Sequence, residues 1–371
     1  MSALKEVAVL FFKLGAVAFG GPAAHIAMME QEVVEKRKWM DRQHFLDLVG
    51  ATNLIPGPNS TEMTMHCGYV RAGWKGLIVA GFCFIFPALV ITGLLAYLYM
   101  EFGSLPTVEP FLYGIKPAVL AIIAGAILKL GKKALKTTEL GIIGALVLIA
   151  SLLGVNEVMA LLSAGVFSLI YYSIREKKSL NSISPLLTIP SATAIIGNVS
   201  TMKVFWIFLK VGSILYGSGY VLFAYLDAEL VTKGLMMRQD LIDAIAIGQL
   251  TPGPVLSTAT FIGYQLNGIG GAIAASIGIF LPSFIFVFIL NPLVKKLRSS
   301  KRLSFFLDTV NIAAVAIMIS VLFSMGRDTL VDWRSWVLCA FGLFFTFGPK
   351  KIGSLWLVIS ASFLGYLLFL I

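Results

Sequence analysis

Long apolar runs separated by short polar segments make up the chain, and the same order of runs occurs in both halves. The apolar runs of the first half cover residues 4–20, 74–100, 111–131, 138–153 and 157–174. Those of the second half cover residues 202–217, 269–292, 304–325, 334–347 and 352–371. About 20 apolar residues in a helix cross the hydrocarbon core of a bilayer. The pattern predicts an all-α polytopic membrane protein with about five transmembrane helices in each half.

Each half also carries one Pro-Gly-Pro between two helical stretches, near residues 43–70 and 239–265. Proline lacks an N–H and pushes the preceding residue out of the helical region, so Pro56-Gly57-Pro58 and Pro252-Gly253-Pro254 interrupt the helices. Within a membrane, interrupted backbone is tolerated only where protein buries it or where it lines a polar cavity. We therefore predict one hairpin per half, either re-entrant or fully spanning. Matching interruptions in two halves are typical of transport sites.

Residues that match at a nearly constant separation indicate that the chain arose by duplication. The matched pairs are Lys13 and Lys210, Arg42 and Arg238, and Pro87 and Pro282, whose separation drifts only from 197 to 195 residues. The predicted divisions are residues 1–175 as the first repeat, residues 176–201 as a cytoplasmic linker, and residues 202–371 as the second repeat.

Charge supports a membrane location and predicts the orientation of the chain. Only 13% of the residues are charged, against roughly 25% in a typical soluble domain. Most of the 29 Lys and Arg residues fall in one set of loops, which the positive-inside rule places in the cytoplasm. The net charge of +10 is therefore assigned to these loops, not to nucleic-acid binding.

Two matching segments differ in charge, which predicts that the halves are inverted. Residues 36–42 are basic, whereas the counterpart segment, residues 227–243, carries four acids: Asp227, Glu229, Asp240 and Asp243. The sequence thus predicts two inverted-topology repeats in the cytoplasmic (inner) membrane, with both termini outside the cytoplasm.

The hairpin tips are the first candidates for an anion site. The helix after each Pro-Gly-Pro begins with unpaired N–H groups and the positive end of its dipole, an arrangement that binds anions. Polar residues beside the tips would cap these helices or bind an oxyanion: Asn53, Asn59, Ser60, Thr61, Gln249, Ser257 and Thr258. The alternative is that the prolines only kink two helices.

Two lysines and two glycine-rich breaks add to these candidates. Lys13 and Lys210 lie within apolar helices, where a lysine faces a cavity or extends to the interface. As a matched pair, they would suit a dianion. Gly20-Gly21-Pro22 and Gly217-Ser218-Gly219 would form an anion nest or allow close packing.

His25 and Glu62 are single candidates with alternatives. His25 would contact the substrate or fill a packing site. Glu62, an acid in an apolar helix, is a candidate for proton coupling. Alternatively, it forms an ion pair with Lys13 or Arg71.

Enzyme and cofactor motifs are absent from the sequence. It contains no His-Glu-x-x-His, Gly-x-Ser-x-Gly, Walker A or dinucleotide fingerprint, so we predict neither an enzyme nor a bound cofactor. The three cysteines lie singly, which predicts neither disulfides nor structural zinc. Without a nucleotide site, transport would be driven by a gradient.

One set of motifs spans both halves of the chain. It consists of Phe19-Gly20-Gly21-Pro22 with His25, Trp39, Pro56-Gly57-Pro58, Tyr216-Gly217-Ser218-Gly219-Tyr220-Val221 and Pro252-Gly253-Pro254. Together these residues resemble the chromate ion transporter family in its two-domain, long-chain form. Ser218 stands where the second half of that family commonly has glycine.

The resemblance implies secondary export of chromate, a tetrahedral oxyanion, with chromate resistance as the result and sulfate as the competitor. Uptake or exchange of sulfate or another anion, and an anion channel, stay open as alternatives to export. A coupling proton and assembly as a homodimer are further possibilities.

Overall fold

Helices form almost all of the described chain. The computed structural model describes residues 2–19, 21–52, 55–103, 105, 108–155, 157–175, 199–216, 219–290, 301–349 and 352–371. Residues 176–198 of the predicted linker therefore lie outside the described residues. Within the described ranges, each apolar run forms a helix close to its predicted bounds.

The helices of the first half follow the predicted order. They are α1 (Ala3–Val17), α2 (Pro22–Glu30) with the π-helix η1 (Gln31–Lys36), α3 (Arg42–Thr52), α4 (Asn59–Phe102), α5 (Glu109–Ala134), α6 (Thr138–Leu152) and α7 (Glu157–Arg175). Helix α2 was predicted only as a polar segment. It forms because Gly21 occupies the N-cap with φ 78° and Pro22 takes the first helical position, where a missing N–H has no cost.

The second half repeats this series. Its elements are α8 (Thr201–Ile214), η2 (Gly219–Val221), α9 (Leu222–Leu226), η3 (Asp227–Val231), α10 (Arg238–Gly248), η4 (Val255–Ser257), α11 (Thr258–Leu290), α13 (Lys301–Thr329), α14 (Trp333–Phe347) and α15 (Ser354–Phe369). The two Pro-Gly-Pro segments join α3 to α4 and α10 to η4 and α11, as the hairpin prediction requires.

Each long helix bends sharply where the hairpin ends and the following apolar run begins. In α4 the bend lies at Ala72 and Gly73, and Gly73 has φ 61°. In α11 it lies at Asn267 and Gly268, and Gly268 has φ 54°. Glycine adopts this left-handed conformation without steric cost. The bends confirm the predicted separation of each hairpin from the apolar run that follows.

Four helices are long and apolar enough to cross a membrane within the described residues: Asn59–Phe102, Glu109–Ala134, Val255–Ile289 and Ser304–Thr329. Shorter apolar helices accompany them at Thr138–Leu152, Met159–Ser168, Trp333–Phe347 and Ser354–Phe369. Helices of 15 or 16 residues reach only about 24 Å, less than the ~30 Å hydrocarbon core. The chain is thus a polytopic membrane protein in which the long and short spans differ.

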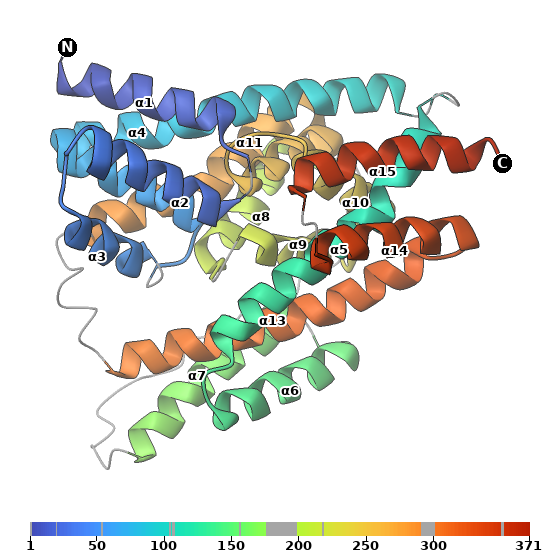
Figure 1. Ribbon diagram of the computed structural model, residues 1–371. Coiled ribbons are helices and arrows are strands. Elements are labelled where there is room, and N and C mark those ends of the chain that lie inside the picture. Colours follow the sequence, from blue (N-terminus) through green and yellow to red (C-terminus); the bar gives the residue numbers. More distant parts are fainter. Residues whose placement is uncertain are drawn as a thin grey trace.

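Helices of each repeat pack against helices of the other repeat. Within each repeat, the first helix packs on the long hairpin helix (α1 on α4 and α8 on α11). Between the repeats, α4 packs on α11. Helix α5 of the first repeat packs against α14 and α15, while α13 of the second packs against α6 and α7 (Figure 1). Each repeat therefore completes the core of the other.

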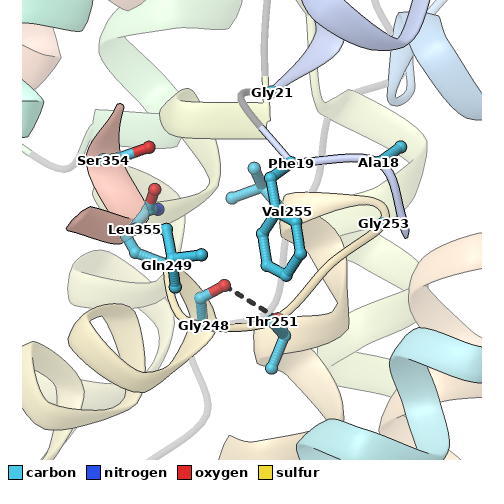
Figure 2. A pocket seen from close by; sticks show the side chains of 10 residues that line it. All are labelled: Ala18, Phe19, Gly21, Gly248, Gln249, Thr251, Gly253, Val255, Ser354 and Leu355. Carbon is cyan, nitrogen blue, oxygen red and sulfur yellow. Dashed lines mark hydrogen bonds between the residues drawn. The ribbon is translucent and has the colours of Figure 1, made fainter. Parts of the chain in front are cut away.

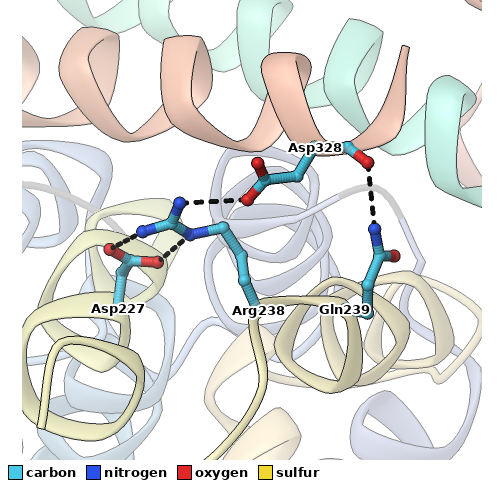
Figure 3. A network of polar contacts seen from close by, with 4 residues as sticks. All are labelled: Asp227, Arg238, Gln239 and Asp328. Atoms are coloured by element: carbon cyan, nitrogen blue, oxygen red, sulfur yellow. Dashed lines mark hydrogen bonds and ion pairs between the residues drawn. The ribbon is translucent and has the colours of Figure 1, made fainter. Parts of the chain in front are cut away.

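The acidic segment 227–243 was predicted to be a loop, and this was wrong. It forms η3 and α10, and its acids Asp227, Glu229 and Asp243 are buried. Burial is tolerated because basic side chains are paired with the acids. Arg238 donates to Asp227 through two nitrogens at 2.9 and 3.2 Å, and to Asp328 of α13 at 3.0 Å (Figure 3).

The same network extends into the first repeat. Asp243 of α10 accepts a hydrogen bond from Tyr99 of α4 at 2.7 Å and pairs with Lys116 of α5 at 3.1 Å. Gln239 donates to the backbone carbonyl of Asp328 at 3.1 Å. The base of the second hairpin is therefore held by polar contacts with both repeats.

Candidate functional site

Each hairpin tip is hydrogen-bonded to the end of the first helix of the other repeat. The N–H of Gly57 donates to the carbonyl of Leu215 at 2.6 Å, and the N–H of Gly253 donates to the carbonyl of Ala18 at 2.9 Å. Ala18 and Leu215 are the C-caps of α1 and α8, where helix carbonyls lack intrahelical partners. Both glycine N–H groups are therefore occupied by tip docking and do not face an anion.

The tips also press against the middle of the opposite long helix. A Cβ atom on Gly253 would lie 2.9 Å from Cβ of Ala88 on α4 and 3.2 Å from the carbonyl oxygen of Gly15. A Cβ atom on Gly57 would overlap the side chains of Glu62 and Ser283. Gly57 and Gly253 have φ of 143° and 87°. The tips thus require glycine for both conformation and space.

A small, partly open pocket lies beside the second tip (Figure 2). Its lining comes from the end of α1, the second hairpin and the start of α15: Ala18, Phe19, Gly21, Gly248, Gln249, Thr251, Gly253, Val255, Ser354 and Leu355. Three of these side chains are polar, namely Gln249, Thr251 and Ser354. The pocket therefore joins both repeats at the docking contact of the second tip.

Two helices begin at this pocket. Helix α2 follows the N-cap Gly21 and α15 follows the N-cap Gly353, and neither N-cap supplies a side-chain acceptor to the first amides. Both N-termini therefore present N–H groups and the positive end of a helix dipole, which together favour an anion. Gly21 and Ser354 at these helix ends line the pocket together with Val255, which begins the helix after the second Pro-Gly-Pro.

The other polar residues of the hairpins are buried in their own turns. Ser60 and Thr61 of the first hairpin are buried in the first turn of α4, which begins at Asn59. In the second hairpin, Thr258 donates to the carbonyl of Val255 at 2.8 Å, and the hydroxyls of Thr251 and Ser257 lie 3.4 Å apart. Of the predicted tip residues, Gln249 and Gly253 line the pocket.

The two matched lysines lie in different surroundings, and neither lines the pocket. Lys13 is on the exposed face of α1. Lys210 pairs with Glu229 at 2.6 Å, and Lys233 pairs with the same carboxylate at 2.5 Å. Burial raises the pKa of Glu229, but hydrogen bonds from both ammonium groups outweigh burial and lower it below its ordinary value. Glu229 is therefore ionised and neutralises charge on Lys210.

His25 supports the docking contact of the second tip. Its Nε2 lies 3.1 Å from the carbonyl oxygen of Ala18, the group that also accepts the N–H of Gly253. The ring is buried and packs edge-on against Phe84 at 5.6 Å. This geometry favours the packing alternative over direct contact with substrate.

Glu62 does not form the ion pairs considered as its alternative. Arg71 donates to Glu6 at 2.7 Å, and Lys13 lies on the exposed face of α1. Four other predicted site residues lie outside the described residues: Gly20, Asn53, Gly217 and Ser218.

Two pocket residues on α15 and a hydroxyl beside Glu62 were not predicted from the sequence. Ser354 and Leu355 line the pocket, although they lie about a hundred residues beyond the second Pro-Gly-Pro in the sequence. Ser283 meets Glu62 across the two repeats. No local motif marks these residues, because only the folded arrangement brings them together.

Comparison with known proteins gives matches along both halves. A family model described as "Chromate transporter" matches residues 5–169 and again residues 202–366. A probable chromate transport protein of Synechococcus elongatus is 28% identical, covering 94% of this chain and 91% of the relative. A chromate transport protein of Cupriavidus metallidurans is 28% identical, covering 98% and 92%. No solved structure matches.

Proposed function

Because the chain belongs to the chromate transporter family, we propose that it exports chromate from the cytoplasm by secondary transport and thereby confers chromate resistance. The match of one transporter model to both halves carries this proposal, since it covers every element that builds the pocket. Family membership also supports a transporter rather than an enzyme.

In this proposal, the substrate binds in the pocket between the end of α1, the second tip and the start of α15. A dianion that leaves water needs hydrogen bonds and positive charge in return. The N-termini of α2 and α15 supply about half a unit of charge each. Gln249 and Ser354 supply polar side chains around the pocket, whereas the hydroxyl of Thr251 donates to the carbonyl of Gly248 (Figure 2).

Sulfate exchange is the second candidate function, because chromate and sulfate share tetrahedral shape and charge. The test is uptake of radiolabelled chromate into everted membrane vesicles, with and without a pH gradient and with excess sulfate. Export predicts gradient-dependent uptake into these vesicles that sulfate reduces. Chromate currents that need no gradient of a second ion would support a channel instead.

We also propose that residues 31–37 face the cytoplasm and residues 231–237 face the opposite side. The exposed residues Glu35 and Thr232 serve as reporters when replaced singly by cysteine, with Cys67, Cys83 and Cys339 changed to alanine. A membrane-impermeant thiol reagent is expected to label the two sites from opposite faces. Labelling of both from one face would contradict the orientation.

The lysine hypothesis and a site in the pocket predict opposite effects of lysine substitutions on chromate affinity. If both lysines held the dianion, Lys13→Met or Lys210→Met would cost on the order of 2–5 kcal/mol of substrate affinity. Because Lys13 is exposed and Lys210 is paired with Glu229, we expect both variants to keep the wild-type chromate affinity. Equilibrium binding of chromate to purified, folded variants measures this affinity. A loss of affinity in both variants would show that the lysines bind the substrate.

A further inference from the structure

A buried carboxyl lies directly behind the first hairpin tip. Glu62 is in the first turn of α4 with 0% of its surface exposed. Neither carboxyl oxygen has a hydrogen-bond partner of good geometry among the described residues, and the same holds for the buried hydroxyl of Ser283. Gly57 separates these two side chains so narrowly that a Cβ atom there would overlap both. One acid and one hydroxyl, from different repeats, thus face each other at the tip.

Among the described residues, no Lys or Arg forms an ion pair with this carboxyl. Ser283 approaches from α11, and Tyr216, which follows α8, is close enough to interact electrostatically with Glu62. His66 lies one turn further along α4 and is also buried. Among the described residues, the ion pairs place Arg71 on Glu6 and Lys210 on Glu229. An ionised, unpaired carboxylate in such a place costs several kcal/mol, whereas the neutral acid avoids most of that cost.

The second repeat shows that tip docking does not need this acid. The counterpart of Glu62, at the same place after the second Pro-Gly-Pro, is Thr258, and the counterpart of Ser283 is Ala88. The second tip packs against Ala88 and still donates its N–H to Ala18. Because an apolar contact holds one tip, docking as such does not require the carboxyl at the other tip.

We propose that Glu62, with the Ser283 hydroxyl beside it, is the proton-binding site that couples transport to a pH gradient. This inference rests on the proposed secondary transport. With its proton bound, the neutral acid fits the dry contact between the first tip and α11. When the O–H bond breaks, the proton passes to water on the accessible side, and the carboxylate that remains favours separation and hydration of the contact. Proton occupancy and tip docking are then linked, as coupling requires.

A proton suits this place better than a metal ion. Sodium, calcium and magnesium are bound by several oxygen ligands, whereas the two facing side chains supply one carboxyl and one hydroxyl. No group of three His, Cys, Asp or Glu residues that could hold a metal is found within the described part of the chain.

The first test observes the proton itself. Infrared difference spectra of purified protein, recorded while the pH is raised, are expected to show loss of the carbonyl stretch of a neutral carboxylic acid. Glu62→Gln should lack this band. Ser283→Ala should keep it to higher pH, because the hydroxyl would no longer stabilise the carboxylate. A wild-type spectrum identical to that of Glu62→Gln would overturn the proposal.

The second test separates coupling from transport. In proteoliposomes, Glu62→Gln is expected to lose chromate accumulation driven by a pH gradient at least tenfold, yet to retain chromate–chromate exchange, which needs no net proton movement. Thr258→Val, at the matching position, is the control and should keep gradient-driven accumulation. Accumulation by Glu62→Gln at the wild-type level would overturn the proposal. If the wild type itself moves no chromate, the proposed function fails, and the infrared band still shows whether Glu62 carries a proton.

Discussion

Gly253→Val is expected to abolish chromate transport while leaving the protein inserted in the membrane. Valine at φ 87° adopts a backbone conformation that costs of the order of 1–3 kcal/mol. Its Cβ would also lie 2.9 Å from Cβ of Ala88 and 3.2 Å from the carbonyl oxygen of Gly15. The tip would have to move away from α4. The N–H of Gly253 would then lose its bond to Ala18, and the adjoining pocket would change shape.

Gly154→Val is a matched control for this experiment. Gly154 has nearly the same conformation, with φ 86°, but a Cβ atom there meets nothing within 4 Å. It therefore carries the backbone strain without the clash at the tip. Chromate uptake, normalised to the amount of folded protein in the membrane, is the measurement. Equal uptake by Gly253→Val and Gly154→Val would show that tip docking is not needed for transport.

Much of the fold follows from local sequence signals. The apolar runs give the helices, and the nearly constant separation of matched residues such as Pro87 and Pro282 indicates the duplication. The hairpin boundaries were predicted from the Pro-Gly-Pro segments and from the start of the next apolar runs, and the positive φ angles of Gly73 and Gly268 mark the bends there. These features depend on residues that are neighbours in the sequence, where conformational preferences act directly.

The candidate site depended on contacts that no local pattern contains. Gly57 meets Leu215 and Gly253 meets Ala18 because the two repeats cross, which places residues about 160 and 235 positions apart in contact. The sequence marked the tips, and the helix starts that follow them, as candidates for an anion site. In the structure, carbonyls at the ends of α8 and α1 accept the N–H groups of Gly57 and Gly253, and the pocket is lined by residues at the starts of α2 and α15 as well as by Val255 of the second hairpin.

The acidic segment was misinterpreted for a related physical reason. A run of acids has the same composition whether water or basic side chains surround it. Asp227 is buried because Arg238, eleven residues later, folds back onto it, and Asp243 because Tyr99 and Lys116 approach from the other repeat. Counting charges in a segment cannot distinguish these situations, since the difference lies in long-range partners.

Arg238→Met is expected to lower the free energy of unfolding by about 3 kcal/mol, the lower end of the range for breaking a buried ion pair. The side chain of Asp227 is only 4% exposed and would lose its two hydrogen bonds from Arg238. The lower end applies because Arg238 itself is 27% exposed and water can partly replace it. Denaturant-induced unfolding in detergent micelles, followed by circular dichroism, measures the change.

Arg42→Met is the control that the duplication supplies. Arg42 is the counterpart of Arg238 and pairs with Glu30, but its side chain is 76% exposed, and surface pairs of this kind contribute about 0–1 kcal/mol. Arg42→Met should therefore lower the free energy of unfolding much less than Arg238→Met does. The double variant Arg238→Met with Asp227→Leu should regain part of the lost stability, because it leaves no unpaired buried charge. If both arginine variants lose the same amount, or if the double variant is as unstable as the sum of its parts, the pair in Figure 3 does not fix the base of the second hairpin.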